Sequence, residues 1–492
     1  MTPFALFIIV LSVSTVIGFS ILTLKKIRKL HYEKLRNIQK KMNTYLLPLL
    51  FVIFLYEKLT YAVANLHLNS QILVRSGVVP LYQPLTMNKF LVHKLHMQQA
   101  KSDNLDLKMN TISNLNYPLQ ALSTKQKSGP NIFIFGVDAL RRSIISQETT
   151  PNIIKFEKES ISFTNNISGG NNTRFGIFSL FYGINSSYWF AFLNAQKGTV
   201  LFDILEREKY QMLISSSADL HWPEFRKTIF IDVQKYIKDD FKGSPLQRDK
   251  QALDYFNRWL DKQDLSKPMF SFVWIDNVHA SHYEKEFRKF IPDDAKNNYL
   301  TVNESEKVKQ LNRYKNAALS ADAKFGAFIQ KLKEKNLYDN SIIILLSDHG
   351  QEFYEYGHFS HNSAYNEAQV KTPLIMHMPN MQAKRVEHLT SHLDIVPTLM
   401  KQLGVTNDVA DYANGEDLFS PNYKRECAFV GNWNENAIVC NKYTIVISNI
   451  VTKSFNNAVY NTQTYKRVEN YDREYVNRVL LNTLNENKKF TK

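Results

Sequence analysis

Cysteine is almost absent from this chain, because its 492 residues include only Cys427 and Cys440. This scarcity excludes a disulfide-dense scaffold and a zinc cluster built from cysteines. A single pair is compatible with an oxidising compartment but does not establish one. The two cysteines flank residues 431–435, a plausible turn between short strands. The sequence therefore fits either a disulfide across a hairpin or two buried free thiols.

Long apolar runs are also few. The mean hydropathy of −0.32 excludes a polytopic membrane protein, because most of the chain must face water. It leaves room for one or two membrane spans. Hydrophobic residues still make up 44% of the chain, which excludes global disorder. The length predicts several domains, or one large α/β unit with attached segments.

Acidic residues are scarce near the N-terminus, where Glu33 and Glu57 are the only two in the first hundred positions. Twelve lysines and arginines oppose them, so this part carries +10 of the formal net charge of +15. An enzyme acting on nucleic acid would more often place its basic surface on the large folded part. Here the excess lies beside apolar segments, which points to a membrane surface and not to nucleic acid.

Two apolar segments near the N-terminus are long enough to span a membrane. Residues 4–24 carry no charge and can cross a hydrocarbon core of about 30 Å. A cleaved signal peptide is the alternative, but it would have a charged start and a shorter apolar core. Residues 44–64 are a weaker candidate, because Glu57 and Lys58 interrupt them. An interfacial or core helix is the alternative there.

Eight lysines and arginines lie in residues 25–41, between the two apolar segments. The positive-inside rule predicts a cytoplasmic loop, so the N-terminus and everything after about residue 66 lie outside the cytoplasm. The loop could also bind anionic lipid or a cytoplasmic partner. We therefore expect four parts: a membrane anchor at 1–66, a connector at 67–130, a hydrolase-like domain at 131–450, and a C-terminal tail at 451–492 that packs on the domain or trails it.

Short apolar runs alternate with helical segments from residue 131 onward. Strands are predicted at 131–137, 212–215, 269–275, 341–346 and 372–377, and helices at 151–159 and 304–337. This alternation predicts an α/β fold with a mostly parallel sheet flanked by helices, preceded by one or two transmembrane helices. Such sheets place their functional sites at the carboxyl ends of the strands.

Acidic side chains follow two of these strands. Asp138 comes directly after 131–137, and Asp348 and His349 come just after 341–346. Carboxylate oxygens and a histidine nitrogen are suitable ligands for Mg²⁺, Mn²⁺ or Zn²⁺. Either aspartate alone could cap a turn or a helix. Together they predict a site for one divalent metal ion.

A loop rich in glycine and asparagine leads into an apolar stretch at Thr173 and Arg174. Thr173 could simply be the N-cap of a helix. A hydroxyl at a helix start also lies in a positive field, and a bound metal would lower its pKa further. Arg174 could make bidentate contacts with a tetrahedral oxyanion.

Several segments in combination resemble the alkaline phosphatase/sulfatase superfamily. They are VDALRR, TRFGIFSLFYG, SDHGQEF with GHFSHN, and SHLDIVPTLM. Over roughly residues 45–450 the chain is most similar to the YejM/PbgA group of sulfatase-like inner-membrane proteins. The resemblance implies that fold, and a location in the bacterial inner membrane with the large domain in the periplasm. It also implies a metal site in which Asp138, Asp348 and His349 are ligands, and in which Thr173 is both a ligand and the nucleophile.

The resemblance implies three further catalytic residues. Arg174 corresponds to an anion-binding residue beside the nucleophile, and His279 and His361 correspond to histidines on the substrate side. Alternatives remain for the histidines. His279 or His282 could be an ordinary loop residue, and His358 could take the role given to His361.

Two departures from the family pattern matter. Sulfatases use a cysteine or serine that is converted to formylglycine, usually in a Cys-x-Pro-x-Arg motif, whereas this chain has Asn172, Thr173 and Arg174 there. Many sulfatases also have a second aspartate where this chain has Ala139. A single metal and a threonine nucleophile fit better, as in lipoteichoic acid synthases and phosphoethanolamine transferases. Relatives in the YejM/PbgA group have more spans, so this chain is expected to be a shortened form.

Two functions therefore follow from the sequence. The first is a membrane-anchored, metal-dependent hydrolase or transferase of phosphate esters or lipid head groups. The second is a weakly catalytic or non-catalytic regulator of outer-membrane lipid homeostasis that binds cardiolipin, another anionic phospholipid or lipopolysaccharide. On that second hypothesis an inner-membrane protein is the expected partner. The substrate and the identity of the metal stay open.

The topology can be tested by cysteine-accessibility labelling. A cysteine placed within residues 25–41 should react only with reagent supplied to the cytoplasm, because the basic loop is predicted to stay inside. A Ser128→Cys variant should react with impermeant reagent from outside. Labelling of Ser128→Cys from the cytoplasmic side alone would contradict the predicted arrangement.

Overall fold

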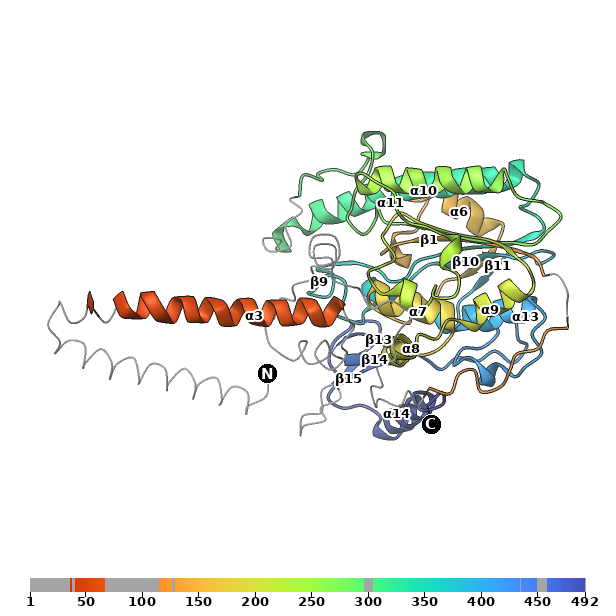
Figure 1. The fold of residues 1–492 in the computed structure, drawn as a ribbon. Coiled ribbons are helices and arrows are strands. Elements are labelled where there is room, and N and C mark those ends of the chain that lie inside the picture. Colours follow the sequence, from red (N-terminus) through yellow and green to blue (C-terminus); the bar gives the residue numbers. More distant parts are fainter. Residues whose placement is uncertain are drawn as a thin grey trace. The chain divides into compact units, whose positions relative to one another are not determined.

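A computed structural model describes residues 36–37, 40–66, 115–125, 129–295, 304–433, 435–448 and 458–491 (Figure 1). The chain divides into two compact units, residues 1–109 and 110–492. The span expected at 4–24, most of the basic loop 25–41 and most of the connector 67–130 lie outside the described residues.

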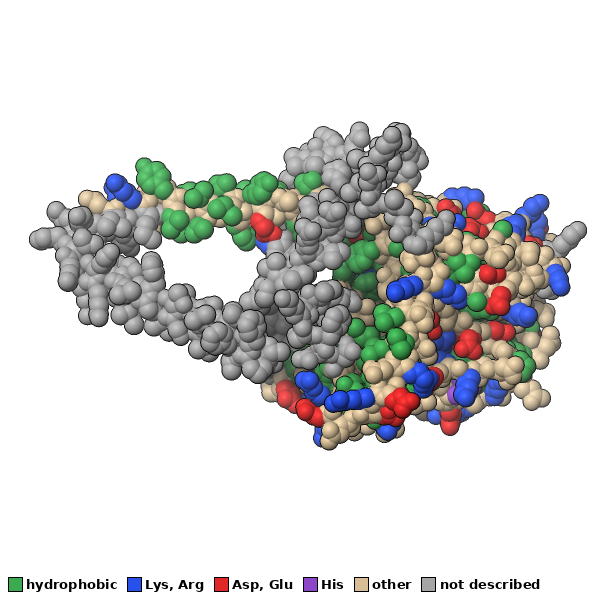
Figure 2. Space-filling model, turned by 90° about the horizontal axis from the view of Figure 1, so that it is seen from below, with side chains coloured by type: hydrophobic (Ala, Val, Ile, Leu, Met, Phe, Trp, Pro, Cys, Tyr) green, Lys and Arg blue, Asp and Glu red, His purple; other side chains and the backbone are tan. Residues whose placement is uncertain are grey.

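The first unit contains helix α3 (Leu47–Leu66), preceded by a π-helical turn (Met42–Leu46). Residues Asn43–Val63 are long and apolar enough to cross a membrane, with a mean hydropathy of 1.7. Hydrophobic side chains are exposed along this helix (Figure 2). Lys58 Nζ lies 3.2 Å from Glu57 Oε2, so the two charges that interrupt the apolar run form an ion pair. This helix corresponds to the second predicted span.

An eight-stranded sheet forms the centre of the second unit. Strand β10 alone runs against the other seven, so the predicted mostly parallel sheet is confirmed. The central strands are buried on both faces, which explains why they read as continuous apolar runs. In spatial order the strands are β11 (Lys384–Val386), β2 (Ile161–Phe163), β10 (Leu374–His377), β7 (Ser341–Leu346), β1 (Asn131–Val137), β6 (Met269–Ile275), β4 (Gln211–Ser216) and β5 (Ile237–Lys238).

Helices cover both faces of this sheet (Figure 1). On one face lie α6 (Pro151–Lys158), α10 (Pro245–Leu260) and α11 (Lys307–Glu334), and on the other lie α7 (Thr173–Tyr182), α9 (Val200–Arg207) and α13 (Ile395–Gln402). The ring of Phe135 on β1 packs 5.4 Å from that of Phe325 on α11. On the opposite face, the ring of Phe272 on β6 packs 5.0 Å from that of Phe181 on α7. The sheet is therefore the middle layer of three.

Shorter elements complete the second unit. They are β3 (Asn166–Ile167) paired with β12 (Thr390–Ser391), β8 (Glu352–Phe353) paired with β9 (Phe359–Ser360), α8 (Trp189–Ala195), α12 (Glu367–Val370) and the 3-10 turns Lys285–Phe287 and His392–Asp394. Asp394 forms a capping box with Ser391 and pairs with buried Arg425. It therefore acts as a helix-start residue.

A second, antiparallel sheet lies at the C-terminal end and carries α14 (Arg473–Glu486). Its strands are β13 (Cys427–Gly431), β14 (Glu435–Cys440), β15 (Tyr443–Ser448) and β16 (Ala458–Asn461). Val476 and Val479 of α14 pack on Ile438 and Ile445 of the sheet. The segment expected as a tail therefore supplies one strand and one helix to this layer.

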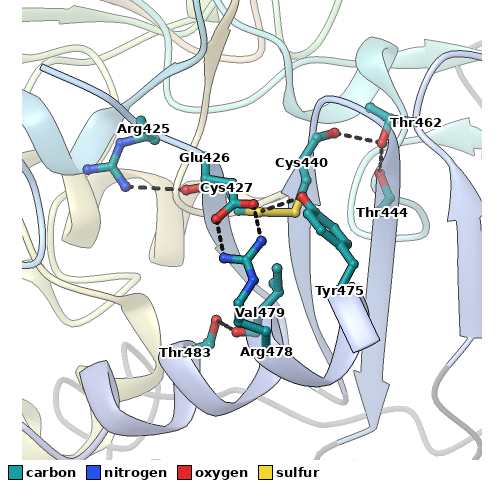
Figure 3. Close-up of a disulfide and its surroundings, with 10 residues drawn as sticks. All are labelled: Arg425, Glu426, Cys427, Cys440, Thr444, Thr462, Tyr475, Arg478, Val479 and Thr483. Atoms are coloured by element: carbon teal, nitrogen blue, oxygen red, sulfur yellow. Dashed lines mark hydrogen bonds and ion pairs between the residues drawn. A yellow bond between two sulfur atoms is a disulfide. The ribbon is translucent and has the colours of Figure 1, made fainter. Parts of the chain in front are cut away.

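The two cysteines face each other across β13 and β14 and form a disulfide (Figure 3). Of the two arrangements that the sequence left open, the bonded one is present. Two ion-pair contacts of Arg478 with Glu426 hold α14 beside this bond. The bond closes the hairpin at the end opposite its turn.

The contribution of the disulfide can be measured on a Cys427→Ala/Cys440→Ala double variant. The bond closes a loop with a sequence separation of 13, so its loss should lower the free energy of unfolding by about 3 kcal/mol through greater freedom of the unfolded chain. Reduced wild-type protein should unfold like the variant. Titration of the denatured, unreduced wild type should find no free thiol, and two thiols per chain would contradict the bond.

Candidate metal and nucleophile site

The site begins where two neighbouring parallel strands end. Gly136 of β1 pairs with Leu346 of β7, so Asp138 and Asp348 leave the same edge of the sheet. The backbone N–H of Ala139 donates to Asp348 Oδ1 over 3.0 Å, which fixes one loop against the other. Parallel pairing thus brings together two carboxylates that are 210 positions apart in the sequence.

The four side chains expected around a metal converge at this edge. His349 Nε2 lies 3.3 Å from Asp348 Oδ2, 3.7 Å from Asp138 Oδ1 and 3.2 Å from Thr173 Oγ1. Ligand atoms of Asp138, Asp348 and His349 all lie within 4.8 Å of one another, and all three residues are buried. This donor set can hold one divalent cation.

The charges at the site favour such a cation. Burial raises the pKa of Asp138 well above its ordinary value, and the charge of Asp348 raises it further. Burial likewise raises the pKa of Asp348. Among the described residues, Asp138 Oδ1 has no hydrogen-bond donor, and no lysine or arginine pairs with either carboxylate. A divalent ion would balance these two negative charges, which no lysine or arginine of the described residues neutralises.

His349 has the protonation state of a neutral metal ligand. Burial lowers its pKa to about 3, so the imidazole is uncharged at neutral pH. Its Nδ1 lies 2.9 Å from the carbonyl oxygen of Gly350, an arrangement that assigns the ring proton to Nδ1. The lone pair on Nε2 therefore faces Thr173 and the carboxylates.

Thr173 is the first residue of α7. Asn172 is the N-cap, since its side chain accepts a hydrogen bond from the backbone N–H of Phe175. The alternative that Thr173 is itself the N-cap is wrong, and its hydroxyl is left to contact His349. A Cβ on Gly176 would collide with the backbone carbonyl of Asp348, so glycine at that position lets the start of α7 approach the ligand loop closely.

Three histidines line one side of the site. The ring centroid of His361 lies 4.4 Å from that of His349 and 5.1 Å from that of His279. His358 instead lies near buried Glu352, with Nδ1 3.8 Å from Oε2. Of the two candidates left by the sequence, His361 is therefore the one beside the metal ligands. The catalytic roles of His279 and His361 remain predictions.

Arg174 forms a buried ion pair beside three tryptophan rings. Its Nη1 lies 2.5 Å from Glu224 Oε2, and both side chains are buried. The guanidinium carbon lies 4.4 Å from the ring centroid of Trp433, 4.7 Å from Trp222 and 5.0 Å from Trp189. The expected contact with a substrate oxyanion remains a prediction, and this geometry does not support it.

Sequence reasoning missed a third acidic strand end. Strand β6 lies beside β1 and ends directly before Asp276, whose Oδ2 lies 3.2 Å from Arg248 Nη2 and whose Oδ1 lies 4.0 Å from His279 Nδ1. Buried Asp249 accepts hydrogen bonds from the backbone N–H groups of Asp276 and Asn277. The strand-end rule that selected Asp138 would also have found Asp276.

Comparison with known families agrees with this geometry. Residues 131–405 match the Sulfatase family model, which covers more than half of the chain. The chain belongs to the sulfatase family. Residues 2–124 match a domain of unknown function, DUF3413.

Individual relatives extend this result. The chain is 26% identical over 467 residues to the inner membrane protein YejM of Salmonella typhimurium, covering 93% of this chain and 73% of YejM. It is 25% identical over 267 residues to the lipoteichoic acid synthase-like YvgJ of Bacillus subtilis, covering 49% and 40%. A solved alkaline phosphatase superfamily protein from Vibrio parahaemolyticus has a TM-score of 0.55 at 18% identity, covering 75% and 90%. The expected superfamily fold and the resemblance to YejM are confirmed.

The metal site can be tested with Asp348→Asn, which keeps the size of the side chain and removes its charge. Purified wild-type protein should contain more bound divalent metal than this variant, because one anionic ligand is lost. A chelator should lower the Tm of the wild type more than that of the variant, since metal binding stabilises the folded state.

Asp264→Asn is a matched control for this experiment, because Asp264 is a surface carboxylate paired with Lys267. It should retain the wild-type metal content and the wild-type response to chelator. Equal metal content in the wild type and in Asp348→Asn would contradict the assignment of Asp348 as a metal ligand.

Proposed function

We propose that the second unit is a metal-dependent hydrolase or transferase that acts on phosphate esters or phospholipid head groups, with Thr173 as nucleophile. The observation that carries this proposal is the position of the Thr173 hydroxyl. It lies at the start of α7, 3.2 Å from His349 Nε2, beside two buried carboxylates. An alcohol held beside a metal-ligand cluster is a usual arrangement for nucleophilic attack.

The residues take the following roles in this proposal. Asp138, Asp348 and His349, with the Thr173 hydroxyl, would hold one Mg²⁺, Mn²⁺ or Zn²⁺ ion. A bound ion of this kind polarises phosphoryl oxygen and favours the alkoxide form of a nearby alcohol. Thr173 Oγ1 would form a bond to phosphorus as the bond to the leaving oxygen breaks. The proton released by the Thr173 hydroxyl would end on this leaving oxygen, and His279 and His361 would assist the transfer or stabilise charge.

Phosphate is favoured over sulfate by the residue at the nucleophile position. Formylglycine requires a cysteine or serine, whereas Thr173 retains a secondary hydroxyl that can attack phosphorus directly. The name of the relative YvgJ, lipoteichoic acid synthase-like, is consistent with phosphoryl transfer. This support concerns the reaction class, and the particular substrate stays open.

We further propose that the protein is anchored in the bacterial inner membrane with its large domain in the periplasm. The apolar helix and the similarity to YejM, an inner membrane protein, support the anchor. The disulfide between Cys427 and Cys440 supports the orientation, because cytosolic thiols are generally kept reduced.

One observation favours the alternative function, a lipid-binding regulator with little turnover. The guanidinium of Arg174 pairs with Glu224, so part of its hydrogen-bonding capacity is already engaged and less is left for a substrate oxyanion. On this alternative the domain would bind an anionic phospholipid, cardiolipin or lipopolysaccharide and pass the signal to an inner-membrane protein. Its distinguishing property is a function that survives loss of Thr173.

Turnover of phosphate esters by Thr173 variants separates these functions. Thr173→Ala should lower kcat by at least about a hundredfold, the effect commonly seen when one principal catalytic group is removed. Thr173→Ser should retain more activity because a hydroxyl remains. The free energy of unfolding should change by less than about 1 kcal/mol in either variant, since the N-cap Asn172 is retained.

Thr406→Ala serves as a control and should keep the wild-type turnover, because the Thr406 hydroxyl forms a hydrogen bond with the Ser123 hydroxyl at the surface. Unchanged turnover in Thr173→Ala together with loss in Asp348→Asn would point to water as the nucleophile. If the wild type shows no metal-dependent turnover of any phosphate ester tested, the regulator hypothesis would replace the enzyme hypothesis.

A further inference from the structure

A cavity of about 540 Å³ lies beside the loop that carries His279. It is lined by Ser281, His282, Tyr283, Lys285, Arg288 and Arg313. The first residues of this lining follow β6, and Arg313 comes from the first half of α11. Only two residues separate His279 from His282, so one short loop contributes both to the candidate site and to the cavity wall.

This loop has a fixed conformation. Asn277 Nδ2 donates to the carbonyl oxygens of His282 and Ala317 over 2.9 and 3.0 Å, and the backbone N–H of His282 donates back to Asn277 over 2.8 Å. Ser281 is buried and adopts a left-handed conformation with φ of 52°. Such strain in a residue other than glycine costs of order 1–3 kcal/mol, persists only where surrounding contacts enforce it, and tends to occur at ligand-binding positions.

The lining carries positive charge without a matching negative charge. Arg313 Nη1 donates to the carbonyl oxygen of Ala295 over 2.6 Å, and none of the described carboxylates pairs with Arg313 or with exposed Lys285. Two of the nearby acids are already engaged, because Asp293 pairs with Arg288 and Glu284 pairs with Lys324. Two cations therefore remain to receive an anionic group.

The charge of Arg313 also affects the pKa of His282 in the loop. Burial lowers the pKa of His282, the positive charge of Arg313 lowers it further, and the negative charge of Asp276 partly opposes both effects. A neutral imidazole beside a guanidinium can donate a hydrogen bond to an anion without adding a charge of its own. The lining thus combines a planar guanidinium, a flexible ammonium and a neutral donor, a combination suited to phosphate.

We propose that this cavity binds a second phosphate group of the substrate, so that the substrate carries two anionic groups. The cleaved group would lie at Thr173 and the second group at Arg313 and Lys285. This inference rests on the proposed function, and it narrows the substrate class to phosphate esters or lipid head groups with two phosphates. The rigid loop from Asn277 to His282 would set the spacing between the two positions.

Turnover by the full chain in detergent tests the assignment. The substrates are 3-hydroxypropyl phosphate, which has one phosphate, and propane-1,3-diol bisphosphate, which has two and an alkyl leaving group of the same kind. Wild type should prefer the bisphosphate in kcat/KM. In an Arg313→Gln/Lys285→Gln variant this preference should fall about tenfold or more through a higher KM, because two charge-assisted contacts are lost. The matched control Arg258→Gln removes a cation of α10 that does not line the cavity, and it should keep the wild-type preference. An unchanged preference in the double variant would overturn the inference.

A binding measurement separates this inference from the proposed reaction. It uses Asp348→Asn, so that the candidate metal site is impaired, and follows acetylation of Lys285 by mass spectrometry. Inorganic phosphate should protect Lys285 relative to chloride at equal ionic strength, while exposed Lys250 should react equally in both. Vesicles of phosphatidylglycerol, compared with phosphatidylcholine, test a lipid head group as the source of the phosphate.

The outcomes are distinguishable. Protection by inorganic phosphate supports a general phosphate site, and protection by phosphatidylglycerol alone supports a lipid head group. Lack of protection by both would overturn the inference, whether or not the wild type shows turnover. Protection of Lys285 without any wild-type turnover would support the cavity and count against the proposed reaction.

Discussion

The burial of two carboxylates side by side is the constraint on which the candidate site depends. Asp138 and Asp348 leave adjacent parallel strands, and both have pKa values raised by burial. Like charges repel strongly where water is excluded. The backbone N–H of Ala139 and the positive end of α7 reduce this repulsion, whereas His349 is neutral and adds no positive charge. A divalent cation bound between these groups would account for their arrangement.

Much of this edge of the sheet could be predicted from the sequence. Apolar runs of six or seven residues marked β1, β6 and β7, because strands buried on both faces show no alternation of polar and apolar residues. Parallel strands end at one edge, so the aspartates that follow β1 and β7 could be assigned to that edge, whereas the pairing of β1 with β7 came only from the structure. The same rule applies to Asp276, which follows β6, but the neighbouring residues did not single it out.

Other features of the site depended on contacts between distant segments. Glu224 lies in a loop fifty positions from Arg174, and no local pattern marks the two as partners. Consecutive polar residues lead into α7, and propensity alone does not decide whether Asn172 or Thr173 caps it. The cysteine pair also stayed open, since hairpin register decides whether two side chains face each other, and the turn sequence did not determine it.

Strand β13 links the disulfide to the loop around the nucleophile. Cys427 lies at one end of this five-residue strand, and Gly431 lies at the other. The backbone N–H of Gly431 donates to Gly169, and its carbonyl oxygen accepts from Asn171, so the strand supports the turn that leads into Thr173. We infer that oxidation of the cysteines and the order of this turn are thermodynamically linked. Loss of the bond would then weaken the support of this turn as well as the hairpin itself.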